Sequence, residues 1–125
     1  KNTGKKYFAI VDAAMNDLIR PAFYESYHEI IPVKQSKART VKTDVVGPIC
    51  ETGDTFCKDR PIPRVAEGDH LALLSAGAYG FVMASNYNAR PRAAEVIVTG
   101  RDVHEVRARE TMADLMRGER RLSSF

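Results

Sequence analysis

The apolar runs of this chain are short, and glycine or proline lies between most of them. Runs of strand length, rich in β-branched and aromatic residues, lie at 7–11, 28–33, 40–46, 69–74, 93–99 and 103–108. No segment between them has the periodicity of the crossover helix that a parallel α/β sheet requires. The pattern therefore predicts a mainly β domain, an antiparallel barrel or sandwich of six or seven strands.

The segments between these runs are expected to be loops. Residues 12–27 are predicted to be irregular or briefly helical, and Pro21 is expected to bias Arg20 away from helical angles. The stretch 56–67 is charged and contains two prolines, which predicts a surface loop. Residues 81–84 are expected to be extended.

The C-terminal tail is the one segment with helical periodicity. Met112, Leu115 and Met116 are spaced at i, i+3 and i+4, with acidic Glu110 at the start and Gly118 after the end. We expect a short helix here, preceded by a hairpin whose turn contains Gly100.

Composition restricts the class of protein. A length of 125 residues fits one domain, and the net charge of +3 is too small to indicate nucleic-acid or membrane binding without a concentrated patch. No apolar run approaches the roughly 18 residues of a membrane span, and the polar N-terminus does not resemble a signal peptide. Two cysteines make no disulfide framework. We expect a cytoplasmic domain, and the missing initiator Met suggests a piece of a longer protein.

The segment 47–54, with the sequence GPICETGD, is the most suggestive of chemistry. A thiol beside a carboxylate, Cys50 and Glu51, can be presented outward by a loop that leaves a strand. The alternative, favoured on spacing alone, is a β-turn with Gly53 at positive φ, Asp54 bonded to its own backbone and Cys50 buried as a small hydrophobe. Neither cysteine has a histidine at ligand spacing, which argues against zinc.

Two other segments carry side chains that could bind an anion. Tyr79 lies in the small-residue loop 75–80, where its phenol could bond a phosphate. An equally supported alternative is a strand-to-strand turn with Tyr79 packed on the barrel rim. Arg20 and Tyr24 lie four residues apart beside a proline, and the guanidinium could bind a carboxylate. The commoner alternative is a surface salt bridge with a half-buried tyrosine.

The histidines and the C-terminal arginines suggest no further site. His70 and His104 are predicted at strand surfaces, whereas His28, next to Tyr27, is compatible with either a surface or a functional position. The arginines near the C-terminus have no aromatic residues between them, so we expect a solvated face or a contact with an absent part of the protein rather than nucleic-acid binding.

Several strings, taken in order, resemble one family. They are VDAAMNDLIRPAFY at 11–24, YH at 27–28, CETGD at 50–54, GAYG at 77–80, and MASNYN with RPR at 83–92. Together they resemble the C-terminal part of the diaminopimelate decarboxylases, which are fold-type III pyridoxal-phosphate enzymes related to alanine racemase. The resemblance covers about residues 7–115. The CETGD string is common to the wider decarboxylase group, and the others are more specific. This chain has Ala14 where the family commonly has Gly, and Thr52 where the family usually has Ser. Neither difference removes a functional group.

The resemblance implies a fold and partners. Residues 1–125 would form a closed Greek-key, six-stranded β-barrel, like the C-terminal domain of alanine racemase, with a short C-terminal helix. The family's N-terminal (β/α)8 barrel is absent from this chain, and so is its Schiff-base lysine for pyridoxal 5'-phosphate. The loop with Cys50 and Glu51 would reach the neighbouring subunit's active site, which implies a homodimer. This chain alone is expected to be inactive.

The implied activity is a lyase of lysine biosynthesis that converts meso-2,6-diaminopimelate to L-lysine and CO2. Cys50 matches the active-site cysteine and is the candidate proton donor to Cα. Arg20, Tyr24 and Glu51 match substrate-binding positions. Tyr79 matches a residue that contacts both the substrate and the cofactor, and no metal is expected.

Charge separates the possible substrates. The far end of diaminopimelate carries a carboxylate, which calls for a cation such as Arg20, and an ammonium, which calls for Glu51 with Tyr24. A diamine precursor such as ornithine has only the ammonium, so Arg20 would repel it. The alternatives are the same domain of an ornithine, arginine or carboxynorspermidine decarboxylase, and a stand-alone β-barrel binding module. The role of Cys57 and the oligomeric state of the separate domain stay open.

Overall fold

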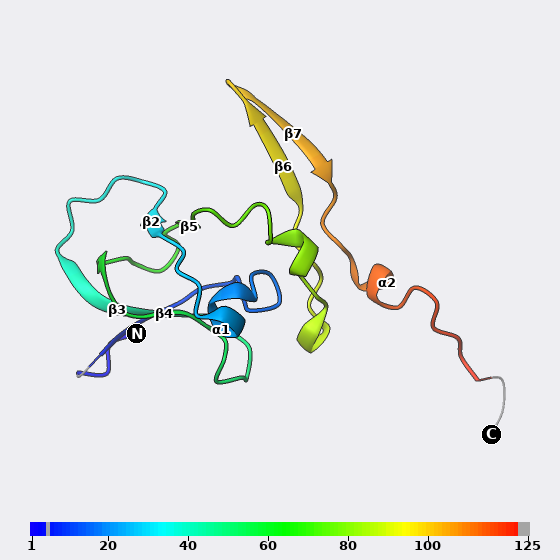
Figure 1. Ribbon diagram of the computed structural model, residues 1–125, viewed down its shortest axis with the longest axis horizontal. Coiled ribbons are helices and arrows are strands. Elements are labelled where there is room, and N and C mark those ends of the chain that lie inside the picture. The colour runs from blue at the N-terminus through cyan, green and yellow to red at the C-terminus, as the bar shows by residue number, and fades with distance from the viewer. Residues whose placement is uncertain (5, 123–125) are drawn as a thin grey trace. The chain divides into compact units, whose positions relative to one another are not determined.

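The computed structural model describes residues 1–4 and 6–122, and the chain divides into two compact units (Figure 1). The first unit is Lys1–Ala84 and the second is Ser85–Phe125. All of the predicted site residues belong to the first unit.

The first unit is built on a three-stranded sheet in the order β1-β3-β4. The central strand β3 (Thr40–Val46) pairs in parallel with β1 (Tyr7–Ile10) and antiparallel with β4 (Thr55–Pro63). Figure 1 shows β3 and β4 running side by side. A second sheet pairs the short strands β2 (Ile30–Pro32) and β5 (Leu71–Leu73). These strands confirm the segments predicted around 7–11, 28–33, 40–46 and 69–74.

The core of the first unit lies between these sheets and the segment before α1 (Arg20–Tyr24). Its members are buried apolar side chains that contact one another: Leu18, Ile30, Val45, Phe56, Cys57 and Ile62. β3 and β4 supply four of the six, because residues of alternating or bulged register turn toward the same side of the sheet.

The prediction of a surface loop over 56–67 is wrong, since most of this stretch is strand β4. Pro61 and Pro63 cannot donate to a sheet ladder, but β4 has a paired neighbour on one side only in its sheet. An edge strand tolerates proline because its free side needs no donor. Asp59 has a φ of 50°, next to a register shift against β3, so a bulge absorbs the irregular sequence.

Two further backbone predictions are wrong. Arg20 is the first residue of α1, because Pro21 falls within the first helical turn, where its missing N–H leaves no bond unmade. Residues Phe81–Met83 form the 3-10 turn η1 instead of an extended segment. The N–H of Met83 donates to the carbonyl of Gly80 at 3.2 Å, so the local turn satisfies the backbone.

The second unit contains η2 (Tyr87–Ala89), the hairpin β6 (Glu95–Thr99) with β7 (Asp102–Arg107), and α2 (Met112–Leu115). The hairpin is antiparallel, and its turn places Gly100 at a φ of 63°. Thr111 begins α2 with a reciprocal capping box to Asp114. The predicted hairpin and C-terminal helix are therefore confirmed.

The prediction of a mainly β chain is confirmed. The described strands form three separate sheets of three, two and two strands, and no closed barrel is present among the described residues. No helix in residues 1–4 and 6–122 is long and apolar enough to cross a membrane.

Candidate functional site

Three predicted site residues come together on the first unit, and we call them the Arg20 cluster: Arg20, Tyr24 and Tyr79. The guanidinium carbon of Arg20 lies 4.9 Å from the ring centre of Tyr79 and 5.6 Å from that of Tyr24. Arg20 and Tyr24 are one helical turn apart in α1, which places them on one face. Each cation–ring contact is attractive because the ring face is negative.

The Arg20 cluster is open to ligands. Both tyrosines are 56% exposed, so neither is the half-buried or rim-packed residue of the alternative interpretations. No ion pair neutralises Arg20 among the described residues, which also excludes the alternative of a salt bridge there. Two aromatic rings orient the guanidinium while its N–H donors stay free for a planar anion such as a carboxylate.

The loop after β5 places Tyr79 in this cluster. Ser75 has a φ of 57°, which turns the chain away from the β2–β5 pair. A Cβ atom at Gly80 would lie 2.6 Å from the carbonyl oxygen of Ala76, so the tight closure of the loop requires glycine. Of the two glycines in this loop, Gly80 thus serves a close backbone approach, whereas a Cβ atom at Gly77 would meet nothing within 4 Å.

A second candidate element is the segment 47–54, which we call the Cys50 loop. Its shape depends on Asp54, which is 3% exposed. The two carboxylate oxygens of Asp54 each accept one backbone N–H at 2.7 Å, one from Ile49 and one from Met15. A Cβ atom at Gly47 would lie 2.2 Å from Asp54 Oδ2, so the carboxylate fills the space a side chain would need.

The Cys50 loop presents the side chains of Cys50 and Glu51 outward. Cys50 and Glu51 are exposed, and Glu51 Oε1 accepts the N–H of Gly53 at 3.1 Å. The alternative of a simple turn is wrong in its particulars, because Gly53 is not among the residues of positive φ and Cys50 is not buried. Within the described residues, no hydrogen bond or ion pair joins Glu51 to Arg20.

The other cysteine differs from Cys50 in its surroundings. Cys57 lies in the core, where burial raises the pKa of its thiol. A thiol that resists ionisation in an apolar core is a packing residue. Cys50 is therefore the reactive candidate of the two.

Two clusters of charge were not predicted from the sequence. In the first unit, Lys6 Nζ lies 2.8 Å from Asp44 Oδ2, and Asp44 Oδ1 accepts the N–H of Asp59 at 2.7 Å. Burial alone would raise the pKa of Asp44, but these hydrogen bonds outweigh burial and hold it below its usual value. Sequence spacing did not indicate this cluster, because its members come from β3, from β4 and from the residue before β1.

In the second unit, Glu110 binds the segment before β6 rather than serving as the acid at the start of α2. Its carboxylate accepts hydrogen bonds from the N–H of Arg92 at 2.8 Å, from the Arg92 side chain and from the Asn86 amide at 2.7 Å. The Arg92 side chain, then the Arg92 N–H and the Asn86 amide, lower the pKa of Glu110 to about 2. Arg92 and Glu110 are 18 positions apart in the chain, a spacing that no helical or strand pattern would single out.

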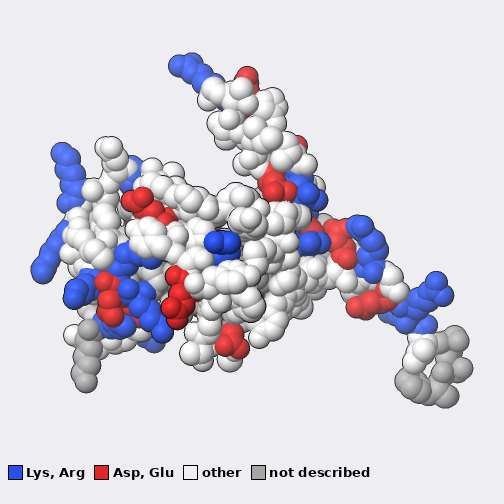
Figure 2. Space-filling view, viewed as in Figure 1, with Lys and Arg blue, Asp and Glu red and all other residues white. Residues whose placement is uncertain are grey.

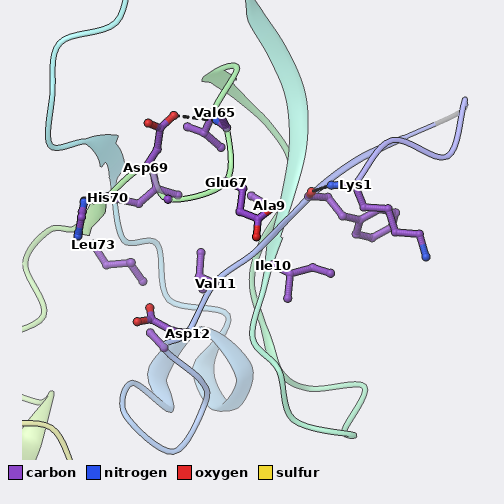
Figure 3. A pocket seen from close by; sticks show the side chains of 15 residues that line it. Lys1, Ala9, Ile10, Val11, Asp12, Val65, Glu67, Asp69, His70 and Leu73 are labelled. Atoms are coloured by element: carbon purple, nitrogen blue, oxygen red, sulfur yellow. Dashed lines mark hydrogen bonds between the residues drawn. The ribbon is translucent and has the colours of Figure 1, made fainter.

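A cavity of about 670 Å³ lies between β1 and the segment 65–73 (Figure 3). The Asp69 carboxylate closes a turn there by accepting the N–H of Ala66 at 2.7 Å. None of the Arg20 cluster and neither Cys50 nor Glu51 lines this cavity. Over the face of the first unit that Figure 2 shows, basic and acidic side chains lie next to one another.

Known proteins resemble this chain over most of its length. Residues 1–77 match the family described as pyridoxal-dependent decarboxylase, C-terminal sheet domain. The diaminopimelate decarboxylase of Pseudomonas aeruginosa is 60% identical over 119 residues, which are 95% of this chain and 28% of that protein. The diaminopimelate decarboxylase of Aquifex aeolicus is 58% identical over 110 residues, 88% of this chain and 26% of the relative.

Solved structures agree. The crystal structure of AQ1208 from Aquifex aeolicus has a TM-score of 0.91 at 55% identity. The match covers 94% of this chain and 29% of the AQ1208 chain. The crystal structure of diaminopimelate decarboxylase from M. jannaschi has a TM-score of 0.92 at 41% identity. The match covers 98% of this chain and 28% of the chain in that structure. The chain thus spans little more than a quarter of these relatives. It belongs to the family of pyridoxal-dependent decarboxylases, as their C-terminal sheet domain.

Proposed function

We propose that this chain is the C-terminal domain of a decarboxylase that converts meso-2,6-diaminopimelate to L-lysine and CO2. The observation that carries the proposal is the Arg20 cluster, an open guanidinium held between two exposed tyrosine rings. Relatives 60% and 58% identical to the chain are named diaminopimelate decarboxylase, which supports this substrate. Catalysis requires the N-terminal (β/α)8 barrel of the complete enzyme, and this chain alone is inactive.

The chain's own residues recognise the far end of the substrate. Arg20 donates paired hydrogen bonds to the far carboxylate, and the Glu51 carboxylate binds the far ammonium with help from the Tyr24 hydroxyl. Ornithine and the other diamine precursors lack the far carboxylate, so the positive charge of Arg20 disfavours them. Specificity follows from charge at this one position.

The residues present fit an anionic cofactor. The exposed phenol of Tyr79 offers a hydrogen-bond donor, and the Arg20 guanidinium carbon, 4.9 Å from the ring centre, brings the positive charge that a phosphate prefers. We propose that Tyr79 contacts both pyridoxal 5'-phosphate and the substrate. When bound, that cofactor stabilises the negative charge that the loss of CO2 leaves on Cα. The exposed thiol of Cys50 holds the proton that is then delivered to Cα.

We further propose that the complete enzyme is a cytoplasmic homodimer in which the Cys50 loop of one copy completes the site of the other. The exposure of Cys50 and Glu51, with no bond to Arg20 in the described chain, supports a site shared between copies. The closed six-stranded barrel stays a prediction for the complete protein.

The test is release of CO2 by the complete enzyme supplied with pyridoxal phosphate. meso-Diaminopimelate is compared with ornithine, arginine and carboxynorspermidine, and the 125-residue chain alone serves as the blank. We expect lysine from diaminopimelate only and no turnover in the blank. Turnover of a diamine precursor instead would keep the family and overturn the substrate. Activity in the blank would contradict the need for the N-terminal barrel.

A further inference from the structure

His28 is a buried residue to which the proposed mechanism assigns no role. It is 4% exposed, and its Nδ1 lies 3.0 Å from the carbonyl oxygen of Leu74. Because a carbonyl oxygen can only accept, Nδ1 carries the hydrogen and donates it. The other ring nitrogen, Nε2, is buried and has no hydrogen-bond partner among the described residues, so the Nδ1 bond is the polar contact that the ring makes there.

This bond lies where the β2–β5 pairing ends. The last backbone bond of that pairing runs from the N–H of Leu74 to the carbonyl of Glu29 at 2.8 Å. The His28 side chain adds one more bond, to the carbonyl of the same Leu74. Both polar backbone groups of Leu74 are thus held by the two residues that precede β2.

Leu74 is the point from which the Tyr79 loop departs. The next residue, Ser75, has a φ of 57°, and the loop then closes tightly at Gly80 against the Ala76 carbonyl. Tyr79 lies inside that closure, with its ring 4.9 Å from the guanidinium carbon of Arg20. A shift at Leu74 would therefore be passed along a short, constrained loop to the Tyr79 ring.

His28 is itself held in place from a third strand. Arg60 in β4 donates a hydrogen bond from Nη1 to the carbonyl of His28. The same guanidinium carbon lies 4.4 Å from the ring centre of Tyr27. The His28 backbone is thus tied to β4, and its side chain to the end of β5.

We infer that His28 is a positioning residue, which fixes the Leu74 carbonyl and so aligns Tyr79 beside Arg20 for substrate and cofactor. The inference rests on the proposed function of the Arg20 cluster. It makes no use of His28 as a proton donor or a ligand. His28 aligns Tyr79 through one hydrogen bond, from its Nδ1 to the carbonyl oxygen of Leu74.

Two substitutions in the complete enzyme separate that hydrogen bond from mere filling of space. In His28→Asn, the amide nitrogen replaces Nδ1, whereas in His28→Gln it falls near Nε2 and cannot reach Leu74 in the same way. We expect H28Q to weaken pyridoxal phosphate affinity and to raise KM for diaminopimelate by about tenfold, the scale of one lost hydrogen bond. H28N should stay within about threefold of wild type in both. The control is His70→Gln, at an exposed position just before β5, which should change neither value.

A double-mutant cycle shows whether His28 acts through Tyr79. If it does, adding H28Q to Tyr79→Phe should weaken cofactor affinity by less than about twofold, because coupled residues are not additive. Equal losses in H28N and H28Q, no loss in either, full additivity with Y79F, or a folding failure of H28Q would each overturn the inference. Cofactor affinity is measured by absorbance titration without substrate. A wild-type enzyme that binds the cofactor and does not decarboxylate diaminopimelate would contradict the proposed function separately.

Discussion

At the scale of single residues, Asp54 does most to shape the Cys50 loop. It accepts backbone N–H groups from Ile49 and from Met15, which lies 39 residues earlier in the chain. Asp54 is part of the CETGD string that carries the family resemblance. Its hydrogen-bond partners, however, depend on a contact between distant segments of the chain, which the string does not reveal. The same limit applies to the Arg20 cluster: residue types suggested an anion site, and only the fold brings Tyr79 to Arg20.

We expect Asp54→Asn to destabilise the complete protein by about 1–3 kcal/mol, the cost of a buried donor that loses its acceptor. The amide nitrogen would face an N–H group in place of one carboxylate oxygen. The matched control is Asp69→Asn, where an exposed carboxylate accepts one N–H from Ala66. Urea unfolding measures both, and equal midpoints for the two variants would show that burial of Asp54 contributes nothing.

At the scale of elements, the strands were predictable where alternation or β-branching is strong, as in β3 and β6. Strand β4 was not predictable, because its charged residues and two prolines are typical of a loop. As an edge strand, β4 forms ladder hydrogen bonds on one side only and so tolerates proline. η1 was missed because its turn depends on a local bond that no apolar pattern indicates. In the second unit, the anchor of the segment before β6 is Glu110, which sequence spacing placed at a helix start.

The Glu110 anchor should make stability depend on pH. A folded-state pKa of about 2, below the ordinary 4.5, means that the unfolded state takes up protons first. The stabilisation is therefore complete above pH 4.5 and is lost as the pH falls toward 2. We expect the unfolding midpoint of wild type to fall more steeply over this range than that of Glu110→Gln. Parallel curves for the two proteins would contradict the anchor.

At the scale of the whole molecule, the chain is about 28% of its relatives, and its surfaces agree with a larger assembly. The β6–β7 hairpin exposes apolar side chains that alternate between its two faces, among them Val96 at 55%, Ile97 at 53% and Val98 at 63%. Strands with two apolar faces are typical of positions covered on both sides. Composition alone could not reveal this, since the apolar fraction of the chain is ordinary.

The complete protein should therefore respond strongly to charge on this hairpin. We expect Val98→Lys to lower its free energy of unfolding by about 2 kcal/mol or more, because an unpaired charge is costly to bury. Thr99→Lys, at the hairpin end opposite Asp102, is the control and should change stability by less than about 0.5 kcal/mol. If neither lysine substitution changed the free energy of unfolding, the hairpin would face water in the complete protein.

Recognition of the far carboxylate by Arg20 is tested most directly by kcat/KM for meso-diaminopimelate with Arg20→Gln in the complete enzyme. Arg64→Gln is the control, because Arg64 also lies over an aromatic ring, with its guanidinium carbon 5.5 Å from the ring centre of Tyr7. We predict a loss of about 100-fold for R20Q, the effect of leaving a bound carboxylate without its cation, and less than about twofold for R64Q. Equal kcat/KM in the two variants would contradict recognition of the far carboxylate by Arg20.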